Sequence, residues 1–177
     1  IFHQKLLDKA LQNNSTILLP EMNDRRIKEA YKNLKSIGLN IASLDDYTYS
    51  LDYYKSHIYK KRFIENWTDE MVESYLSCPL TQSLLLLDNN LVDGVVAGAT
   101  LPTSEVIRSA IRIIGMSINS RWVSSIFFMT NSNNGKAYTF SDCAIIPEPN
   151  EEQLVSIAYN ASEFHQLLSD EIPKIAF

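Results

Sequence analysis

Long apolar runs are missing from this 177-residue sequence, in which the four leucines at 84–87 form one of the longest. A membrane-spanning helix needs about 20 mostly apolar residues in a row, so the sequence predicts no such helix. The first residues also lack the basic, apolar and small-residue order of a secretory signal. We therefore expect a cytoplasmic protein that has no membrane segment.

Cysteine and histidine are scarce. The two cysteines, Cys78 and Cys143, lie far apart in the chain and do not form a C-x-x-C pair, which favours free thiols over a disulfide. The three histidines are His3, His57 and His165, and their spacing is not that of metal ligands. The sequence therefore predicts neither a structural disulfide nor a metal site.

An excess of basic charge is missing too. The formal net charge of −5 argues against a nucleic-acid-binding protein, which needs a basic face. What is present is ordinary for a globular domain, with 45% hydrophobic and 21% charged residues. A chain of this length suits one domain, or one domain with a small part of another.

Short apolar runs alternate with segments of helical periodicity, which is typical of an α/β fold with a mainly parallel sheet and helices on both sides. Asn23 and Asp24 are candidate N-caps of one helix and Thr68 is an expected N-cap of another, and Gly38 is an expected left-handed helix end. The expected strands cover residues 16–19, 39–44, 91–97, 122–129, 136–145 and 172–177. The expected helices cover residues 2–11, 25–37, 57–64, 69–76, 81–88, 103–114 and 151–168.

The strand-to-helix turn at residues 98–104 is the first candidate site. The N–H groups that open a helix lack partners and attract anions, and Thr103 and Ser104 add hydroxyl donors. The other interpretation is an ordinary capped helix start. Arg108 lies one turn further on, off the apolar stripe of the helix, where its guanidinium could bind phosphate in a two-point geometry or simply be solvated.

Two further residues are weaker candidates. Cys143 lies near the end of an apolar strand, and ligands of open α/β sheets bind outside the carboxyl ends of strands. The other interpretation of Cys143 is a small buried hydrophobic residue. Arg62 follows Lys60 and Lys61, a pattern that suits a solvated basic helix face as well as anion binding.

Four motifs follow one another between Val92 and Pro149. They are D-G-x-x-x-G-A at 93–99, T-x-x-x-x-R at 103–108, V-S-S-x-F-F-M at 123–129 and F-x-D-C-A-x-x-P-x-P at 140–149. In this order they resemble the motifs of the phosphate acetyltransferase (phosphotransacetylase) and phosphate butyryltransferase family. The resemblance implies a three-layer αβα fold of the isocitrate-dehydrogenase-like kind. It also implies that residues 1–177 are the N-terminal part of this fold, without the family's second half.

The implied reaction is reversible acyl transfer from acetyl phosphate to coenzyme A, which gives acetyl-CoA and phosphate. By the resemblance, Arg108, Thr103 and Ser104 bind phosphate, Arg62 contributes to anion binding, and Cys143 is a structural or binding residue. The family's thiol base and most of its coenzyme A contacts lie in the second half. The family resemblance further implies coenzyme A as a substrate, no tightly bound cofactor, no metal and a homodimer.

The sequence also departs from the family pattern. Leu101 and Pro102 replace a His and a Thr, Met22 replaces a Gly in the early P-E-G-x-D-x-R stretch, and residues 45–56 are shorter than in the family. These departures keep two other functions open. One is a non-catalytic domain that senses acyl-CoA, as in the related domains fused to malic enzymes, and the other is a phosphate butyryltransferase.

Overall fold

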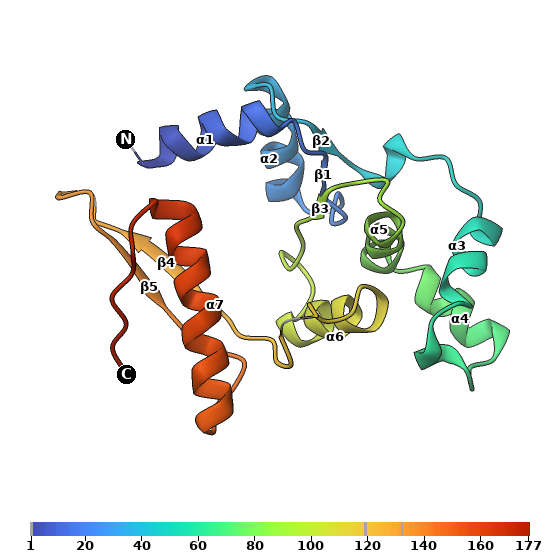
Figure 1. Ribbon diagram of the computed structural model, residues 1–177. Coiled ribbons are helices and arrows are strands. Elements are labelled where there is room, and N and C mark those ends of the chain that lie inside the picture. Colours follow the sequence, from blue (N-terminus) through green and yellow to red (C-terminus); the bar gives the residue numbers. More distant parts are fainter. Residues whose placement is uncertain (1, 119, 132) are drawn as a thin grey trace. The chain divides into compact units, whose positions relative to one another are not determined.

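The computed structural model describes residues 2–118, 120–131 and 133–177, which divide into two compact units (Figure 1). One unit comprises Ala10–Gly115. The other combines the residues up to Lys9 with Met116–Phe177. In the described part of the chain, no helix is long and apolar enough to cross a membrane.

The unit of residues 10–115 contains the expected parallel sheet. Its central strand β1 (Ile17–Leu18) lies between β2 (Ile41–Ala42) and β3 (Gly94–Val95), and both pairings are parallel. The α/β class and the parallel pairing early in the chain are therefore confirmed. The strands are shorter than the apolar runs predicted, because the parallel pairing covers only residues 17–18, 41–42 and 94–95.

Helices precede, connect and follow the strands of this sheet. The elements in chain order are α1 (Phe2–Asn13), α2 (Arg25–Ser36), η1 (Leu44–Asp46), α3 (Leu51–Ile58), η2 (Arg62–Ile64), α4 (Asp69–Leu76), α5 (Pro79–Asp88) and α6 (Thr103–Ile113). Both predicted N-caps are confirmed: the Asp24 carboxylate accepts the N–H of Arg26 at 2.7 Å, and the Thr68 hydroxyl accepts that of Met71 at 3.3 Å. The predicted left-handed Gly38 is confirmed by its φ of 92°.

The core of this unit is built around α5. This helix carries Leu80 and the run Leu84–Leu86, all of which are buried, and it contacts α3, α4, α6 and β3. A helix that is apolar on most of its surface needs neighbours all round, so α5 takes the central place. Leu18 from the sheet and Ile113 from α6 belong to the same cluster.

The D-G-x-x-x-G-A motif has a clear structural role. Asp93 accepts the N–H of Thr16 at 2.7 Å and so ties the start of β3 to the start of β1. Gly94 lies opposite Ile17, where an added Cβ would come within 2.8 Å of a side-chain carbon of that residue. Gly98 has a φ of 107°, which L side chains rarely adopt. The motif therefore sets both the strand pairing and the turn that follows it.

The second unit contains a separate antiparallel hairpin of β4 (Phe127–Thr130) and β5 (Ala137–Phe140). The long helix α7 (Glu151–Ser169) contacts β5, and Phe2 of α1 stacks on Phe128 at 5.2 Å between ring centroids. Between the two strands, the N–H of Gly135 donates to the carbonyl oxygen of Asn131 at 2.8 Å, in agreement with the predicted turn, whereas Ser132 of the N-S-N-N-G sequence lies outside the described residues. Both strands are shorter than the predicted 122–129 and 136–145.

Two predicted elements are wrong. The expected helix at 57–64 is replaced by α3, which begins at Leu51 because the Ser50 hydroxyl caps it, and by the short η2. The expected strand at 172–177 has irregular backbone. A strand needs a neighbour that supplies ladder hydrogen bonds, and no described strand pairs with these residues.

Candidate functional site

The carboxyl ends of the three parallel strands define the edge of the sheet where an α/β fold binds ligands. Glu21 follows β1 in the chain, Ser43 follows β2, and the turn of residues 98–101 follows β3. We call these four residues, Gly98 to Leu101, the β3–α6 turn. They join the sheet to α6, the helix on which three of the predicted site residues lie.

The β3–α6 turn wraps around the side chain of Glu21. One carboxylate oxygen accepts the N–H groups of Gly98 and Ala99, each at 2.8 Å. The other accepts the N–H and the hydroxyl of Thr100, each at 2.7 Å, and the N–H of Leu101 at 3.1 Å. Five donors thus converge on one carboxylate. The carboxylate takes the place that a bound anion such as phosphate would take at a turn of this kind.

The environment of Glu21 keeps it ionised. The residue is only 8% exposed, and burial by itself would raise the pKa of its carboxyl group. The hydrogen bonds from the Thr100 hydroxyl and from the N–H groups of Ala99, Thr100 and Leu101 outweigh this and lower the pKa to about 2. Glu21 is therefore a buried anion in the physiological pH range.

Arg26 makes a second connection to the same turn. Its guanidinium donates to the carbonyl oxygen of Ala99 at 2.9 Å and to the carboxylate of Asp24 at 2.8 and 3.0 Å. The hydrogen bonds from Arg26 lower the pKa of Asp24 to about 2. Residues 21–26 include Met22, which replaces a Gly of the family pattern. This segment holds the β3–α6 turn through Glu21 and Arg26.

This arrangement changes the predicted anion site. The N–H groups of the β3–α6 turn already have an acceptor, so a ligand can use only the donors of the first turn of α6. Those donors are the N–H and hydroxyl groups of Thr103 and Ser104, both exposed residues. Ser104 and Arg108 are four residues apart, which places them roughly 40° apart around the helix.

Arg108 is exposed on α6, as the sequence predicts for a residue off the apolar stripe. Side chains on a helix tilt toward its N-terminus, so a long side chain at position 108 is suited to reach toward Ser104 and the helix start. The buried face of α6 includes Ser109 and Ile113. Ser109 was not part of the predicted stripe, and its hydroxyl accepts that of Tyr75 at 3.3 Å.

Arg62 opens η2 and is exposed. The next residue, Phe63, lies with its ring 5.6 Å from the guanidinium of Arg112 and 5.8 Å from the ring of Tyr75. The segment of Arg62 therefore lies beside α6, next to Arg112 rather than next to Thr103. An anion-binding role for Arg62 stays a prediction.

Cys143 belongs to the other unit, and its predicted proximity to Arg108 stays a prediction. Its thiol is half-buried and donates to the carbonyl oxygen of Phe140 at 3.2 Å, and its N–H donates to the Ser125 hydroxyl at 2.8 Å. Asp142 accepts the N–H groups of Ser125 at 2.8 Å and of Ile146 at 2.5 Å. The conformation around Cys143 is thus held by its neighbours.

Asp142 resembles Glu21 in its chemistry. Burial would raise the pKa of its carboxyl group, but the hydrogen bonds from the hydroxyl and N–H of Ser125 and from the N–H groups of Ile146 and Ala144 lower it well below its usual range. The V-S-S and D-C-A motifs therefore meet through Ser125 and Asp142. This contact explains why the two motifs occur together.

Asp142→Asn should lower the free energy of unfolding of the unit that contains Cys143 by about 1.5–3 kcal/mol, because a charged acceptor of several N–H groups becomes neutral. The measurement is denaturant unfolding followed by the fluorescence of Trp122, in a Trp67→Phe background. Glu148→Gln, a nearby exposed carboxylate, is the control. Equal stability of the two variants would contradict the role assigned to Asp142.

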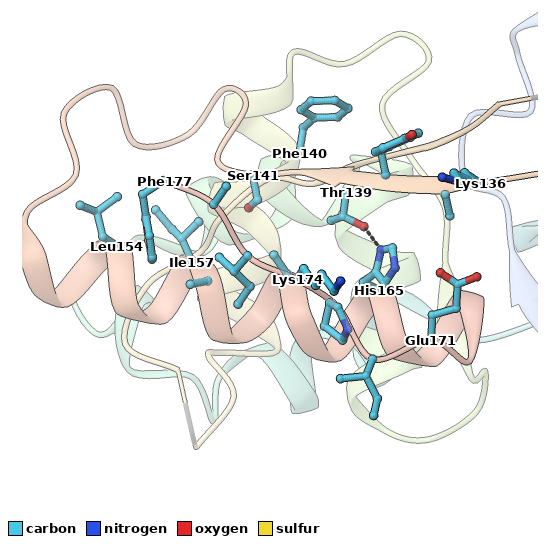
Figure 2. A pocket seen from close by; sticks show the side chains of 18 residues that line it. Lys136, Thr139, Phe140, Ser141, Leu154, Ile157, His165, Glu171, Lys174 and Phe177 are labelled. Carbon is cyan, nitrogen blue, oxygen red and sulfur yellow. Dashed lines mark hydrogen bonds between the residues drawn. The ribbon is translucent and has the colours of Figure 1, made fainter.

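One cavity lies in the same unit and has a volume of about 550 Å³. Figure 2 shows its lining from β5, α7 and the C-terminal segment, including Ile157, Phe177 and the buried His165. Nδ1 of His165 lies 2.9 Å from the hydroxyl oxygen of Thr139. A second cavity of about 510 Å³ lies between α4, α5 and α6, lined by Trp67 among others.

Neither of these two cavities is lined by a predicted site residue. Within residues 2–118, 120–131 and 133–177, no group of three or more His, Cys, Asp or Glu side chains is arranged to hold a metal ion. The arrangement that best suits a charged substrate is therefore the exposed start of α6, with its N–H groups, two hydroxyls and Arg108.

The family model described as "Phosphate acetyl/butaryl transferase" matches residues 40–177. The chain belongs to this family. A phosphate acetyltransferase of Acetivibrio thermocellus is 27% identical over 203 residues, covering 99% of this chain and 61% of that protein. A phosphate acetyltransferase of Treponema pallidum is 37% identical over 103 residues, covering 55% of this chain and 31% of that protein.

Solved structures agree with the family assignment. The crystal structure of a phosphotransacetylase from Streptococcus pyogenes matches with a TM-score of 0.80 and 25% identity, covering 95% of this chain and 58% of that one. The chain thus spans about 60% of the length of the Acetivibrio and Streptococcus proteins. The alignment with the Acetivibrio protein is longer than the chain itself, so that relative carries residues that have no counterpart here.

Three residues of this family member were missed as site residues in the sequence: Glu21, Asp142 and His165. Glu21 follows a buried strand directly after Pro20, a position that the strand-end rule singles out. Asp142 precedes Cys143 in the F-x-D-C-A-x-x-P-x-P motif, and His165 lies within the helix predicted at 151–168. Each of the three residues also has a hydrogen-bond partner that is distant in sequence: the β3–α6 turn for Glu21, Ser125 for Asp142 and Thr139 for His165.

Proposed function

We propose that this chain provides the phosphate-binding part of a phosphate acetyltransferase, which transfers an acetyl group between acetyl phosphate and coenzyme A. The observation that carries the proposal is the first turn of α6, where Thr103 and Ser104 offer donors, together with the exposed Arg108 four residues after Ser104. Family membership supports the reaction type, and curated relatives named phosphate acetyltransferase support the acetyl group over the butyryl group.

The chemistry follows from the charges. The thiolate of coenzyme A attacks the acetyl carbonyl carbon, and phosphate leaves with both electrons of the broken C–O bond. Positive helix-end dipoles and a guanidinium stabilise the negative charge that grows on the leaving phosphate. Thr103 and Ser104 orient the phosphate oxygens through their hydroxyl and N–H groups. Arg108 neutralises the charge of the phosphate.

The thiol base is the missing component. Glu21 contacts the β3–α6 turn, Asp24 binds Arg26 beside it, and Asp142 belongs to the F-x-D-C-A-x-x-P-x-P motif. All three have lowered pKa values and accept several hydrogen bonds, so they are poor proton acceptors for a thiol. The proposal therefore assigns this chain to phosphate binding and assigns thiol activation to residues beyond it. It includes coenzyme A as a substrate without a tightly bound cofactor, a homodimeric assembly and a cytoplasmic location.

Arg108→Ala should weaken acetyl phosphate binding about 10- to 100-fold, because a charged hydrogen bond is worth about 1.5–3 kcal/mol. Calorimetric titration of the chain with acetyl phosphate gives the dissociation constant. In an active form of the protein, the half-saturating concentration of acetyl phosphate should rise more than that of coenzyme A.

Arg112→Ala is the matched control, since it removes the same charge from the same helix one turn further from its start. We expect it to leave the affinity for acetyl phosphate within about twofold of the original chain, because surface charges contribute little at that distance. Equal losses from the two substitutions, or equal effects on both substrates, would contradict the phosphate-binding role of Arg108.

A further inference from the structure

The contacts of Glu21 form a specific arrangement that phosphate binding at α6 does not itself require. Its side chain extends from the end of β1 to the β3–α6 turn, which lies more than seventy residues further along the chain. All five donors lie within 3.1 Å of a carboxylate oxygen. Arg26 reinforces the contact by donating to the carbonyl oxygen of Ala99 at 2.9 Å.

Four consecutive N–H groups that point to one place repel one another unless an anion balances them. Such a concave set of N–H groups is a common phosphate seat, but at 8% exposure Glu21 leaves no room here for a phosphate from solution. The next residues, Pro102 and Thr103, begin α6 directly. The conformation of the β3–α6 turn therefore determines where the first turn of α6 presents its donors.

We propose that Glu21 is a positioning residue, a built-in anion that holds the β3–α6 turn and thereby orients the phosphate-binding start of α6. The orienting part rests on the proposed function, whereas the holding part stands on the hydrogen bonds alone. Glu21 does not touch the substrate in this proposal. It acts through Thr103 and Ser104, which do.

Amide hydrogen exchange tests the holding part. Glu21→Gln replaces the anion with a neutral amide, and exchange of the N–H groups of residues 98–101 should become at least roughly tenfold faster. Thr100→Val is a milder second variant, which removes only the hydroxyl donor. It should also make exchange at residues 98–101 faster, and it provides the test if Glu21→Gln does not fold. Glu29→Gln, on the exposed face of α2, is the control. Unchanged exchange in both Glu21→Gln and Thr100→Val would overturn the proposal.

Chemical rescue tests whether an anion is what the turn requires. Glu21→Ala removes the carboxylate and leaves space for a free one. Added acetate should then slow exchange at residues 98–101, whereas sodium chloride of the same ionic strength should not. Equal effects of acetate and chloride would overturn the built-in-anion assignment.

Titration with inorganic phosphate tests the orienting part. The amide resonances of Thr103 and Ser104 report binding, and Glu21→Gln should weaken the affinity about tenfold. Val72→Ala creates a cavity in the core away from the turn, and it serves as a control variant of reduced stability. It should leave the affinity unchanged. Equal weakening by both variants would overturn the positioning role.

The two proposals fail separately. If the unaltered chain does not bind phosphate at Thr103 and Ser104, the proposed function is wrong, and hydrogen exchange still decides whether Glu21 holds the turn. If phosphate binds but Glu21→Gln does not weaken it, the proposed function stands and the positioning role is wrong.

Discussion

Lowering the pH from about 6 to about 2 should destabilise the unit of residues 10–115 by about 3 kcal/mol through Glu21 alone. The hydrogen bonds of the β3–α6 turn lower the pKa of Glu21 from 4.5 to about 2 in the folded state. One pKa unit corresponds to about 1.4 kcal/mol. A lowered folded-state pKa contributes stability that is complete above the unfolded value and is lost as the pH falls through the folded value.

Denaturant unfolding at a series of pH values measures this contribution. Trp67 belongs to this unit and Trp122 to the other, so a Trp122→Phe background reports the unit of Glu21 through Trp67 fluorescence. Glu21→Gln should be less stable than the unaltered chain at pH near 7, and the two curves should converge near pH 2. If the free energies of unfolding of the two chains differ by the same amount at every pH, the ionised form of Glu21 does not stabilise the fold.

The 177-residue chain alone should transfer acetyl groups at least about 10²- to 10⁴-fold more slowly than a full-length phosphate acetyltransferase. A positioned base contributes about that factor to a proton-transfer step, and Glu21 and Asp142 are held by hydrogen bonds that lower their pKa values. A free thiol like that of coenzyme A, with a pKa of about 8.5, is only a few per cent ionised at neutral pH. The chain also spans about 61% of its Acetivibrio relative.

The rate of thiol loss from coenzyme A in the presence of acetyl phosphate measures this activity. The full-length Acetivibrio enzyme is the reference under the same conditions. Without a base, any residual rate of the chain should keep rising as the pH passes the thiol pKa, because the concentration of thiolate limits the reaction. A rate comparable with the reference, or a plateau below the thiol pKa, would show that the chain contains the base.

The sequence by itself determined the family, the α/β class and most helix starts. Local signals suffice for these: Asp24 and Thr68 cap helices through their own neighbours, and Gly38 adopts a positive φ at a helix end. The motifs at 93–108 predicted a turn followed by a helix, and α6 begins at the expected Thr103. Helical periodicity also placed Arg108 off the buried face.

Only the tertiary structure decided which groups at this turn are free. A sequence shows that the turn carries N–H donors. It does not show that the carboxylate of Glu21, which follows β1, accepts the hydrogen bonds of these donors. The strand predicted at 172–177 failed for a related reason, since strand pairing depends on a partner from elsewhere in the chain. Contacts between residues distant in sequence come from packing, because local propensity fixes an element and not its partners.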